Sequence, residues 1–566
     1  MSPEVFLRDK VPLSAGEHRR LTVGRGRGVF DSLTASRAAA LAAVAWSAGC
    51  SGSPASKFTS GEVLNVPFSE PDSGNVLGHT GVTTLPDGAV VPSSSGLTVL
   101  CDAGSGAQCS NQGCPAGGTT KITGRVLDPA GKNPLWNVTV FVKDPALALP
   151  ELAGGAPVCG CGSLYPADVL GFGMTDATGH FEIDAAPYGA VSLVVQIGKW
   201  RKEVDGINVN RCATNAVGDL LLPKSSAEGN LPDIAISTGG ADSLECLPLR
   251  IGVDASEYVA GAGPGHIHIF HGYDGANTAV AGPDSVNALW DTTADLQKND
   301  VVLLSCEGAE TTGGGGAGEG AGGGGGAPMS NAFQQSLLDY ASAGGRVFAS
   351  HYHYAWFKEP AGAPGPVAFA AANVATWQGK NAINEAIDDS RSFSEDVDTS
   401  LADGGAFPEG VVLKTWLGSV GAAASGLLPV QYARINVAAL NDGVEWIHLD
   451  PSVTASALAS GSKTKFVPSA PQYFSVDTPL GAPGANVCGR VVYSDLHVSG
   501  GPGMGVGSFA PDYAGNGANT VPDGCAMHDL SPQEAALEFM LFDLSSCLVT
   551  IGSSSPAQPP VVAQPK

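Results

Sequence analysis

The chain is poor in positive charge. It has 29 Lys and Arg residues against 54 Asp and Glu residues, which gives a formal net charge of −25 at pH 7. Binding to nucleic acid needs a footprint of basic side chains, and electrostatic docking on an anionic membrane surface needs one too. From this composition we therefore expect neither nucleic-acid binding nor electrostatic binding to an anionic membrane surface.

Long apolar segments are also missing, since no run reaches the roughly 20 residues that a membrane-spanning helix needs. The glycine-rich run 313–326 is followed by no Gly-Lys-Ser/Thr, so it lacks the signature of a phosphate-binding loop and is expected to be a tolerated loop insertion. Charged residues are scarce at 15%, and 77 of the 566 residues are Gly, which favours loops and small-residue packing. This length exceeds one hydrophobic core and predicts two ordered domains.

The first 49 residues have the features of a signal peptide. Basic residues lead, a small apolar stretch follows over 38–48, and Ser47-Ala-Gly-Cys50 closes it. This closure resembles the lipobox of bacterial lipoproteins, although that family usually has Leu where Ser47 stands. The resemblance implies acylation of Cys50 and a membrane attachment through the lipid anchor alone. An ordinary cleaved signal is the alternative. In both cases we expect an exported protein, facing the periplasm from the outer membrane or exposed at the cell surface.

Eleven cysteines follow the predicted lipidation site, and in an oxidising compartment they predict disulfides first and metal ligands second. Cys159 and Cys161 are too close for the CxxC of a zinc knuckle, so we expect them to bond to separate partners such as Cys212 and Cys246. Because the number of these cysteines is odd, at least one of them is expected to keep a free thiol or to pair with another molecule. Cys306, at the end of a predicted core strand, is our candidate for it.

Changes in composition divide the chain into segments. Residues 50–118 are rich in Ser, Gly and Pro, which predicts a flexible tether with a small cysteine knot. Alternating apolar and polar residues with turn signals predict a β-sandwich over 119–242. From 243 to 549, short apolar strands alternate with helices, which predicts an α/β domain with a parallel sheet. We expect a mixed insertion at about 361–485 that folds over the sheet edge, and a disordered tail over 550–566. The knot would join Cys101, Cys109 and Cys114.

The segment 119–242 resembles the carboxypeptidase regulatory-like domain, a transthyretin-like β-sandwich. The family implies no catalysis, because such modules stabilise, space or bind. In physical terms, Asp176 and Gly179 fit a hairpin turn, and Phe181 fits the space between two sheets. The resemblance is carried by Gly124, Val126, Asp128, Gly131, Pro134, Leu135, Val138 and Val140, and then by Thr175, Asp176, Gly179, Phe181, Pro187 and Gly189.

In the last segment, strands are predicted over 249–254, 266–271, 300–305, 346–350 and 489–494. A helix over 331–342 ends at Gly344-Gly345, and another begins with Ser531 as N-cap, Pro532 in the first turn and Glu534 completing a capping box. The insertion is expected to hold a helix near 408–420 and strands around Tyr432, Trp446 and Phe474.

The segment 243–549 resembles the ThuA-like branch of the class I glutamine-amidotransferase-like fold. The resemblance is carried by Asp300-Val-Val-Leu-Leu, by the stretch from Leu338 to His351, and by the stretch from Gly489 to His497. It implies a flavodoxin-like α/β fold. Amidotransferase chemistry needs a nucleophilic Cys on the turn where His351 stands, and Cys306 lacks the flanking glycines of such a turn. Enzymatic activity is therefore uncertain, and the resemblance implies only an association with sugar metabolism.

The predicted strand ends bring titratable residues to one edge, where open α/β sheets bind ligands. His351 and His353 are two apart and share a face, and Asp495 and His497 repeat that spacing. If the two pairs converge, they form a pocket that suits a divalent ion or hydrogen bonds to a sugar. The alternative is that these polar residues only cap the core. The complete candidate set is Asp254, His271, Glu307, His351, His353, Asp495 and His497.

The sequence thus predicts a multidomain protein, a β-sandwich followed by a flavodoxin-like, ThuA-like α/β domain. We expect a cell-envelope lipoprotein that binds a carbohydrate or another polar small molecule at its strand ends, without a resident cofactor or metal. A metal-assisted hydrolase or sugar-modifying enzyme is one alternative, and a non-catalytic structural envelope protein is the other. His266 and His268 lie earlier on their strand and are expected to be ordinary sheet histidines.

Overall fold

The structure is a computed structural model with two compact units, residues 1–76 and 77–566, and every described residue belongs to the second. The predicted signal peptide, Cys50, most of the tether, Glu307, the run 313–326 and the tail 550–566 lie outside the described residues. The structure describes Cys114, 118–155, 159, 163–166, 168–184, 186–239, 242–272, 284–306, 330–359, 365–378, 392–431, 434–457, 466–497, 525 and 527–548, together with the strands β1 (Val82–Thr84), β2 (Val90–Pro92) and β3 (Thr98–Val99).

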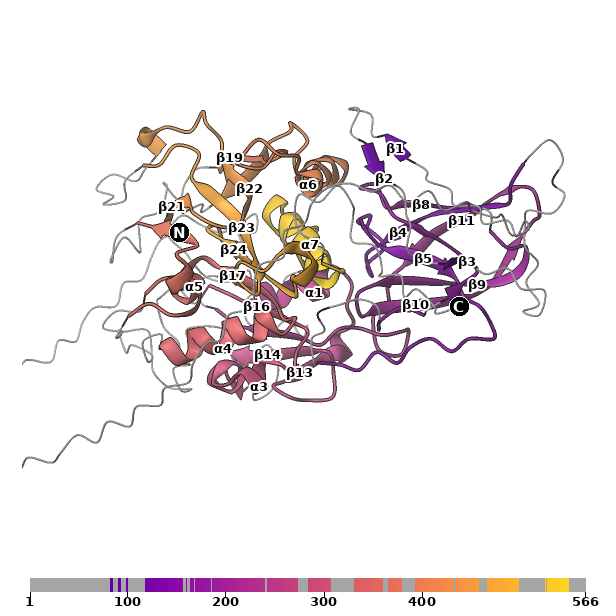
Figure 1. The fold of residues 1–566 in the computed structure, drawn as a ribbon, viewed down its shortest axis with the longest axis horizontal. Helices are drawn as coiled ribbons and strands as arrows, with labels where there is room; N and C mark the ends of the chain where they lie inside the picture. Colours follow the sequence, from indigo (N-terminus) through magenta and orange to yellow (C-terminus); the bar gives the residue numbers. More distant parts are fainter. Residues whose placement is uncertain are drawn as a thin grey trace, which may run out of the picture. The chain divides into compact units, whose positions relative to one another are not determined.

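The described part is rich in β-structure, with several sheets and few helices (Figure 1). Two small sheets share one core, because alternate residues of their strands are apolar and buried. The turn at Asp176 and Gly179 is confirmed, since Gly179 has a φ of 75° and donates to the Asp176 carbonyl at 2.9 Å. One sheet has the order β10–β9–β5–β7 and the other β11–β4–β8, made of β4 (Lys121–Leu127), β5 (Thr139–Val142), β7 (Gly171–Met174), β8 (His180–Ile183), β9 (Gly189–Ile197), β10 (Trp200–Val209) and β11 (Thr214–Leu221).

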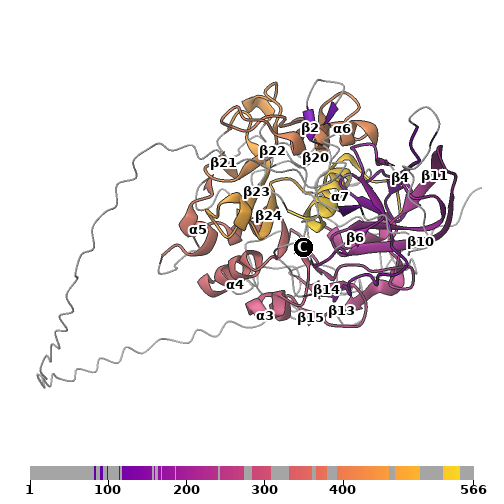
Figure 2. The same cartoon turned by 45° about the vertical axis from the view of Figure 1, so that its right-hand side comes forward.

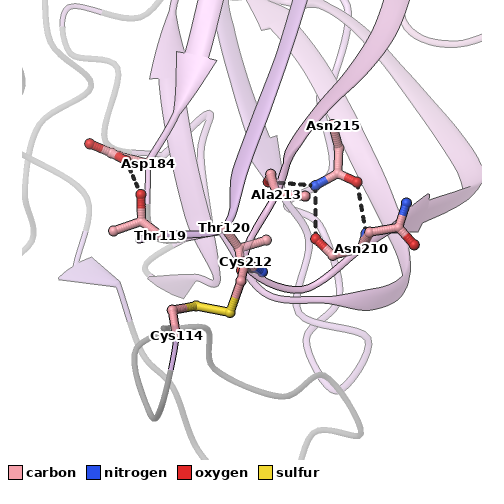
Figure 3. The surroundings of a disulfide bond; sticks show 8 residues. All are labelled: Cys114, Thr119, Thr120, Asp184, Asn210, Cys212, Ala213 and Asn215. Carbon is pink, nitrogen blue, oxygen red and sulfur yellow. Dashed lines mark hydrogen bonds between the residues drawn. A yellow bond between two sulfur atoms is a disulfide. The ribbon is translucent and has the colours of Figure 1, made fainter. Parts of the chain in front are cut away.

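A disulfide joins Cys114 to Cys212 beside these sheets (Figure 3). The backbone amide of Cys212 also donates to the Thr120 hydroxyl at 2.9 Å. The prediction of a knot among the three tether cysteines is therefore wrong for Cys114. The tether also contributes ordered pairing, because β1 pairs with β2, and β3 pairs with β6 (Asp168–Val169). Local composition predicted neither the disulfide nor the pairing of β3 with β6, because each joins segments that are far apart in the chain.

The large sheet has 11 strands, in the order β13–β14–β12–β16–β17–β24–β23–β22–β19–β20, with β15 pairing β14. Pairing is parallel from β13 to β24 and antiparallel from β24 to β20. The parallel strands are β12 (Ile234–Ser237), β13 (Tyr258–Ala260), β14 (Ile267–His271), β15 (Asp284–Ser285), β16 (Val301–Leu304), β17 (Arg346–Ser350) and β24 (Gly489–Ser494). Four of them, β12, β16, β17 and β24, are buried along their whole length, as such apolar runs require, whereas both residues of β15 are exposed.

The start of this sheet differs from the prediction. The expected strand over 249–254 is wrong, because α1 (Leu247–Arg250) lies there with Pro248 in its first turn, where Pro suits a helix. The sheet instead takes β12, which precedes the predicted domain boundary at 243 and lies between β14 and β16. All four β12 residues are buried. An apolar run this short does not reveal from sequence which sheet it joins.

The insertion extends the sheet and does not fold over its edge. Four of its strands, β23, β22, β19 and β20, continue from β24 in antiparallel pairing, whereas β18 and β21 pair with each other in a separate two-stranded sheet. The predicted helix is present as α6 (Pro408–Ser419). Strands occur near Trp446 and Phe474 as predicted. The strands are β18 (Ala375–Trp377), β19 (Ser392–Val397), β20 (Leu428–Gln431), β21 (Val437–Leu440), β22 (Val444–Leu449) and β23 (Pro471–Thr478).

Helices cover both faces of the parallel strands (Figures 1 and 2). The predicted helix α4 (Asn331–Ser342) shares a core with Val347 and Val491, whereas α7 (Pro532–Ser545) shares another with Phe348 and Val492. Successive strand residues face opposite sides, so the two helices cover opposite faces. The predicted capping box of α7 is present. The short helices α2 (Asn287–Trp290), α3 (Thr293–Leu296) and α5 (Ala368–Ala372) complete the α4 side.

Two further disulfides differ from the suggested pairing. Cys159 bonds to Cys488, and Cys246 bonds to Cys525. Cys159 and Cys246 therefore have partners hundreds of residues away, which spacing could not reveal. The prediction that Cys306 keeps its thiol is confirmed. Among the helices that the structure describes, none has the length and apolarity to cross a membrane.

Candidate functional site

Three adjacent parallel strands end at one place. Leu304 of β16 pairs with Ala349 of β17, which pairs with Tyr493 of β24. Each of these strands is followed within one to three residues by a side chain able to bind a metal or move a proton, which is Cys306 after β16, His351 after β17 and His497 after β24. Because the strands are parallel and in register, those side chains are brought to the same edge of the sheet.

His351 and His497 meet at this edge although 146 residues separate them. The His351 Nδ1 lies 3.1 Å from the His497 Nε2, and the ring centroids are 4.8 Å apart with an angle of 82° between the planes. The expected convergence of the two strand ends is therefore present for these two imidazoles. Their exposed fractions are 1% and 4%, so they lie beneath the surface and not in an open pocket.

Cys306 completes the group, although it was not among the site residues predicted from the strand ends. Its Sγ lies 3.3 Å from the His351 Nδ1, and one donor atom from each of Cys306, His351 and His497 lies within 4.8 Å of the other two. Cys306 is fully buried. The sequence did hold a signal, since Cys306 follows the strand next to His351. The absence of flanking glycines argued only against a nucleophilic role for Cys306 and did not bear on metal binding.

The backbone at His351 explains how its ring reaches this position. His351 has a φ of 38°, in the left-handed region that non-glycine residues rarely adopt, and it opens the 3-10 helix η4 (His351–Trp356). The chain therefore turns sharply as it leaves β17. The Tyr493 hydroxyl lies 3.0 Å from the His351 carbonyl oxygen and holds this turn against β24.

His353 does not join the group, because core hydrogen bonds occupy both of its ring nitrogens. Its Nε2 donates to the Ser305 carbonyl at 2.8 Å, and its Nδ1 accepts from the Trp356 indole at 3.0 Å. Burial lowers the pKa of His353 to about 4, which keeps the ring neutral. The bond to Ser305 fixes the backbone directly before Cys306, so His353 supports the group from behind.

Asp495 is likewise turned away from His497. One carboxylate oxygen accepts from the backbone amides of Asn436 and Val437, and the other from the Asn436 side chain at 3.0 Å. The Tyr493 hydroxyl lies 2.9 Å from that second oxygen. Burial raises the pKa of Asp495 to about 7, although these donors lower it. Asp495 thus joins the insertion to the end of β24.

Both imidazoles of the group are held neutral. Burial, then the charges of His497, Arg434 and His353, hold the pKa of His351 well below its usual range. Burial and the charge of Arg434 do the same for His497. Arg434 is itself only 4% exposed and lies near enough to act on both rings. Neutral imidazoles can donate or accept one hydrogen bond at each nitrogen and can ligate a metal.

The other predicted site residues do not join the group. Asp254 caps the 3-10 helix η3 (Ala255–Glu257) by accepting from the Ser256 amide at 2.8 Å, so its expected strand-end role is wrong. His271 does end β14, but β12 lies between β14 and β16 in the sheet. Glu307 lies outside the described residues. The local pattern could not show that β12 separates His271 from the other strand ends.

Two other groups of titratable residues lie elsewhere. Asp233 accepts from His266 at 2.8 Å and lies 3.5 Å from the Nε2 of His268, at the opposite ends of the parallel strands. In the insertion, the Nδ1 of His448 lies 3.1 Å from a carboxylate oxygen of Asp398 and 3.9 Å from one of Glu445, and this group is half-buried. His266 and His268 are thus held by polar neighbours at the start of their strand, as sheet histidines commonly are.

No protein-family model and no curated protein matches this chain. Solved structures match parts of it. A 9R-lipoxygenase from Cyanothece is 24% identical with a TM-score of 0.12, over 18% of this chain and 16% of the lipoxygenase. A type II cohesin-X-dockerin complex from Acetivibrio cellulolyticus is 14% identical with a TM-score of 0.13, over 24% of this chain and 85% of that one. The major pilin subunit of Bacillus cereus is 17% identical with a TM-score of 0.12, over 19% of this chain and 30% of the pilin. Scores this low support no inference about function.

Proposed function

We propose that this chain is an exported cell-envelope protein that binds a small polar ligand at the carboxyl ends of β16, β17 and β24. The observation that carries the proposal is the meeting of His351 and His497, whose ring nitrogens lie 3.1 Å apart although the chain separates them widely. Cys306 adds a thiol to the same place. Polar groups gathered at the carboxyl edge of a parallel sheet are the usual location of ligands in this kind of architecture.

Burial restricts what the ligand can be. The side chains of His351, His353, Asp495 and His497 are at most 4% exposed, so a ligand held by them must be small and enclosed. A carbohydrate at these residues stays a prediction, and their burial counts against a large sugar. Two of the four residues serve instead to support the site, because their polar atoms already have partners. The ThuA-like resemblance of this half also stays a proposal.

The cellular location rests on separate observations. The disulfides Cys114–Cys212, Cys159–Cys488 and Cys246–Cys525 are consistent with an oxidising, extracytoplasmic compartment. The lipobox resemblance at Cys50 supports anchoring by acylation, either facing the periplasm or at the cell surface. The regulatory-like β-sandwich then serves as a spacer between the anchor and the strand-end site.

Ligand binding can be tested by thermal unfolding of the whole chain, exported so that its disulfides form and carrying no affinity tag. A panel of monosaccharides, inorganic phosphate and divalent metal ions is added to the wild type and to His497→Ala. We expect at least one compound to raise the melting temperature of the wild type and not of His497→Ala. His180→Ala, which changes an exposed histidine on β8, should respond like the wild type. If no compound separates His497→Ala from the wild type, the proposal fails and a structural envelope protein is favoured.

A further inference from the structure

We propose that Cys306 Sγ, His351 Nδ1 and His497 Nε2 are the protein ligands of a single transition-metal ion of the zinc class. This inference rests on the proposed function, since it assigns the ligand of the same site. It replaces the predicted His/Asp set with a set of one thiol and two imidazoles, contributed by the ends of three neighbouring strands.

The spacing of the donor atoms fits a tetrahedral ion. With zinc–nitrogen bonds of about 2.1 Å and zinc–sulfur bonds of about 2.3 Å, donor atoms around zinc are separated by roughly 3.4–3.6 Å. The nitrogen–sulfur distance from His351 to Cys306 is 3.3 Å, and the nitrogen–nitrogen distance from His351 to His497 is 3.1 Å. For these two pairs, an ion at the centre requires the atoms to move apart by only a few tenths of an ångström. The Cys306 Sγ and the His497 Nε2 lie within 4.8 Å of each other.

The hydrogen bonding inside the group supports the same conclusion. The His351 Nδ1 faces both the Cys306 Sγ and the His497 Nε2, but one ring nitrogen carries either one proton or one lone pair. It therefore cannot make a full hydrogen bond to each neighbour. A cation between the three atoms accepts a lone pair from every one of them, so all three are satisfied at once.

The chemistry of the donors selects the metal. A thiolate and two imidazoles suit borderline-soft ions such as zinc, whereas calcium and magnesium prefer oxygen. Arg434 places a positive charge near both imidazoles, and a thiolate from Cys306 in the assembled site offsets part of it.

Each ligand is held in place by a hydrogen bond to its backbone or its neighbour. His353 fixes the Ser305 carbonyl just before Cys306, and the Tyr493 hydroxyl lies against the carbonyl of His351. The Gln533 side chain of α7 donates to the carbonyl of His497. These bonds hold the backbone from which the three ligands project, whereas the other ring nitrogen of His351, Nε2, has no hydrogen-bond partner among the described residues. Three protein donors leave the fourth position of a tetrahedral ion to water or to another donor.

Metal content provides the test. The whole chain, exported and free of tags, is stripped with a chelator, reloaded with zinc, and measured by elemental analysis after desalting. We expect one zinc per chain in the wild type. Cobalt added in place of zinc should give a thiolate-to-cobalt charge-transfer band, which reports directly on Cys306. In Cys306→Ser that band should vanish, and in His497→Gln the affinity for zinc should fall by 10-fold to 100-fold or more.

Two controls decide where the ion binds. His448→Gln alters the half-buried group of Asp398, Glu445 and His448, which is the other described cluster with ligand-like spacing, and it should retain the zinc. Circular dichroism of each variant shows whether it is folded. If Cys306→Ser does not fold, the comparison of zinc binding relies on His497→Gln. Loss of zinc from His448→Gln with retention in His497→Gln would overturn the assignment. So would a wild type that binds no stoichiometric zinc.

The failure of this inference differs from the failure of the proposed function. The wild type could bind no zinc and still be stabilised by a sugar or by phosphate that does not stabilise His497→Ala. In that case the assignment of a metal ligand is wrong, and the proposed binding site stands. If neither zinc nor any organic compound distinguishes the variants from the wild type, both proposals fail together.

Discussion

His351 shows how a single backbone angle creates the site. A positive φ costs a non-glycine residue on the order of 1–2 kcal/mol, because its Cβ approaches the following carbonyl. The structure keeps this angle because the Tyr493 hydroxyl binds the His351 carbonyl and the rings of Tyr352 and His497 pack against its imidazole. The sharp turn after β17 directs the imidazole of His351 toward Cys306. An extended backbone at this position would direct the ring away from Cys306. Strain of this kind is often found at functional positions.

Glu395 is a second residue in an energetically unfavourable environment. It lies on β19, is fully buried, and neither carboxylate oxygen has a hydrogen-bond partner among the described residues. Burial, then the negative charge of Asp495, raises the pKa of Glu395 well above its usual range. A raised pKa means that the folded protein holds this proton more tightly than the unfolded chain. The stability linked to Glu395 is therefore present below about pH 4.5 and is lost as the pH rises toward the folded-state pKa.

Glu395→Gln tests this linkage. The amide has the same shape and no charge, so the variant should be as stable as the wild type near pH 4 and more stable at pH 8 by about 1–3 kcal/mol. Urea unfolding at both pH values measures the difference. Glu151→Gln, which changes an exposed glutamate, should show no such gain. A constant difference between Glu395→Gln and the wild type across pH would show that Glu395 does not titrate in this range.

At the scale of the element, the repeated Gly-Arg start of β17 and β24 has a packing cause. A Cβ on Gly489 would lie 1.9 Å from the Ala341 carbonyl oxygen, and one on Gly345 would lie 2.4 Å from the Tyr340 ring. Both glycines let the end of α4 approach the strands closely. The arginines that follow are buried, and Arg490 pairs with Asp477 and Asp543.

Gly489→Ala should therefore destabilise the fold by about 1–3 kcal/mol, because the added methyl group forces α4 away from β24. Gly418→Ala is the matched control. Gly418 is an exposed residue of α6 with open space at its Cβ position, so alanine there should stabilise by about 0.5–1 kcal/mol through its higher helix propensity. Chemical denaturation of the two variants beside the wild type measures both effects. Equal effects of the two substitutions would show that the close approach is not what requires glycine at 489.

At the scale of the whole molecule, the sandwich and the large sheet are joined through α7. Every residue from Gln533 to Leu544 is buried. The ring of Phe539 stacks on that of Trp136 in the sandwich with 5.8 Å between ring centroids, and the centroids of Phe542 and Trp200 are 5.7 Å apart. A buried ion pair at 2.5 Å also joins Lys199 to Asp300 at the start of β16. The hydrophobic core thus runs without a break from one part to the other.

Long-range disulfides reinforce this union. Cys159 and Cys488 are 329 residues apart, whereas Cys114 and Cys212 are 98 apart. In the chain-entropy description, a longer closed loop restricts the unfolded chain more. Replacing Cys159 and Cys488 by Ser should cost about 2–4 kcal/mol, and replacing Cys114 and Cys212 about 1 kcal/mol less. Urea unfolding without reductant measures both. A larger loss from the Cys114/Cys212 pair would show that native contacts, and not loop length, decide the contribution.

Local patterns predicted a large part of the elements. α4 was expected at 331–342 and α7 with its capping box at Ser531, and both are present because caps, glycine stops and helical periodicity act over a few residues. β17 and β24 were predicted with their bounds, as apolar runs between a glycine and a polar end. The short strand β12 was missed, because four apolar residues carry no sign of the sheet they join.

For the site, local spacing was enough to predict that imidazoles follow β17 and β24, since His351 and His497 stand within three residues of these strands. It took the folded structure to bring the two rings together, to direct His353 and Asp495 toward other partners, and to place Cys306 beside them. The same holds for the disulfides, whose partners lie far along the chain. The physical reason is that strand order and side-chain direction depend on contacts between distant segments, which no local pattern encodes.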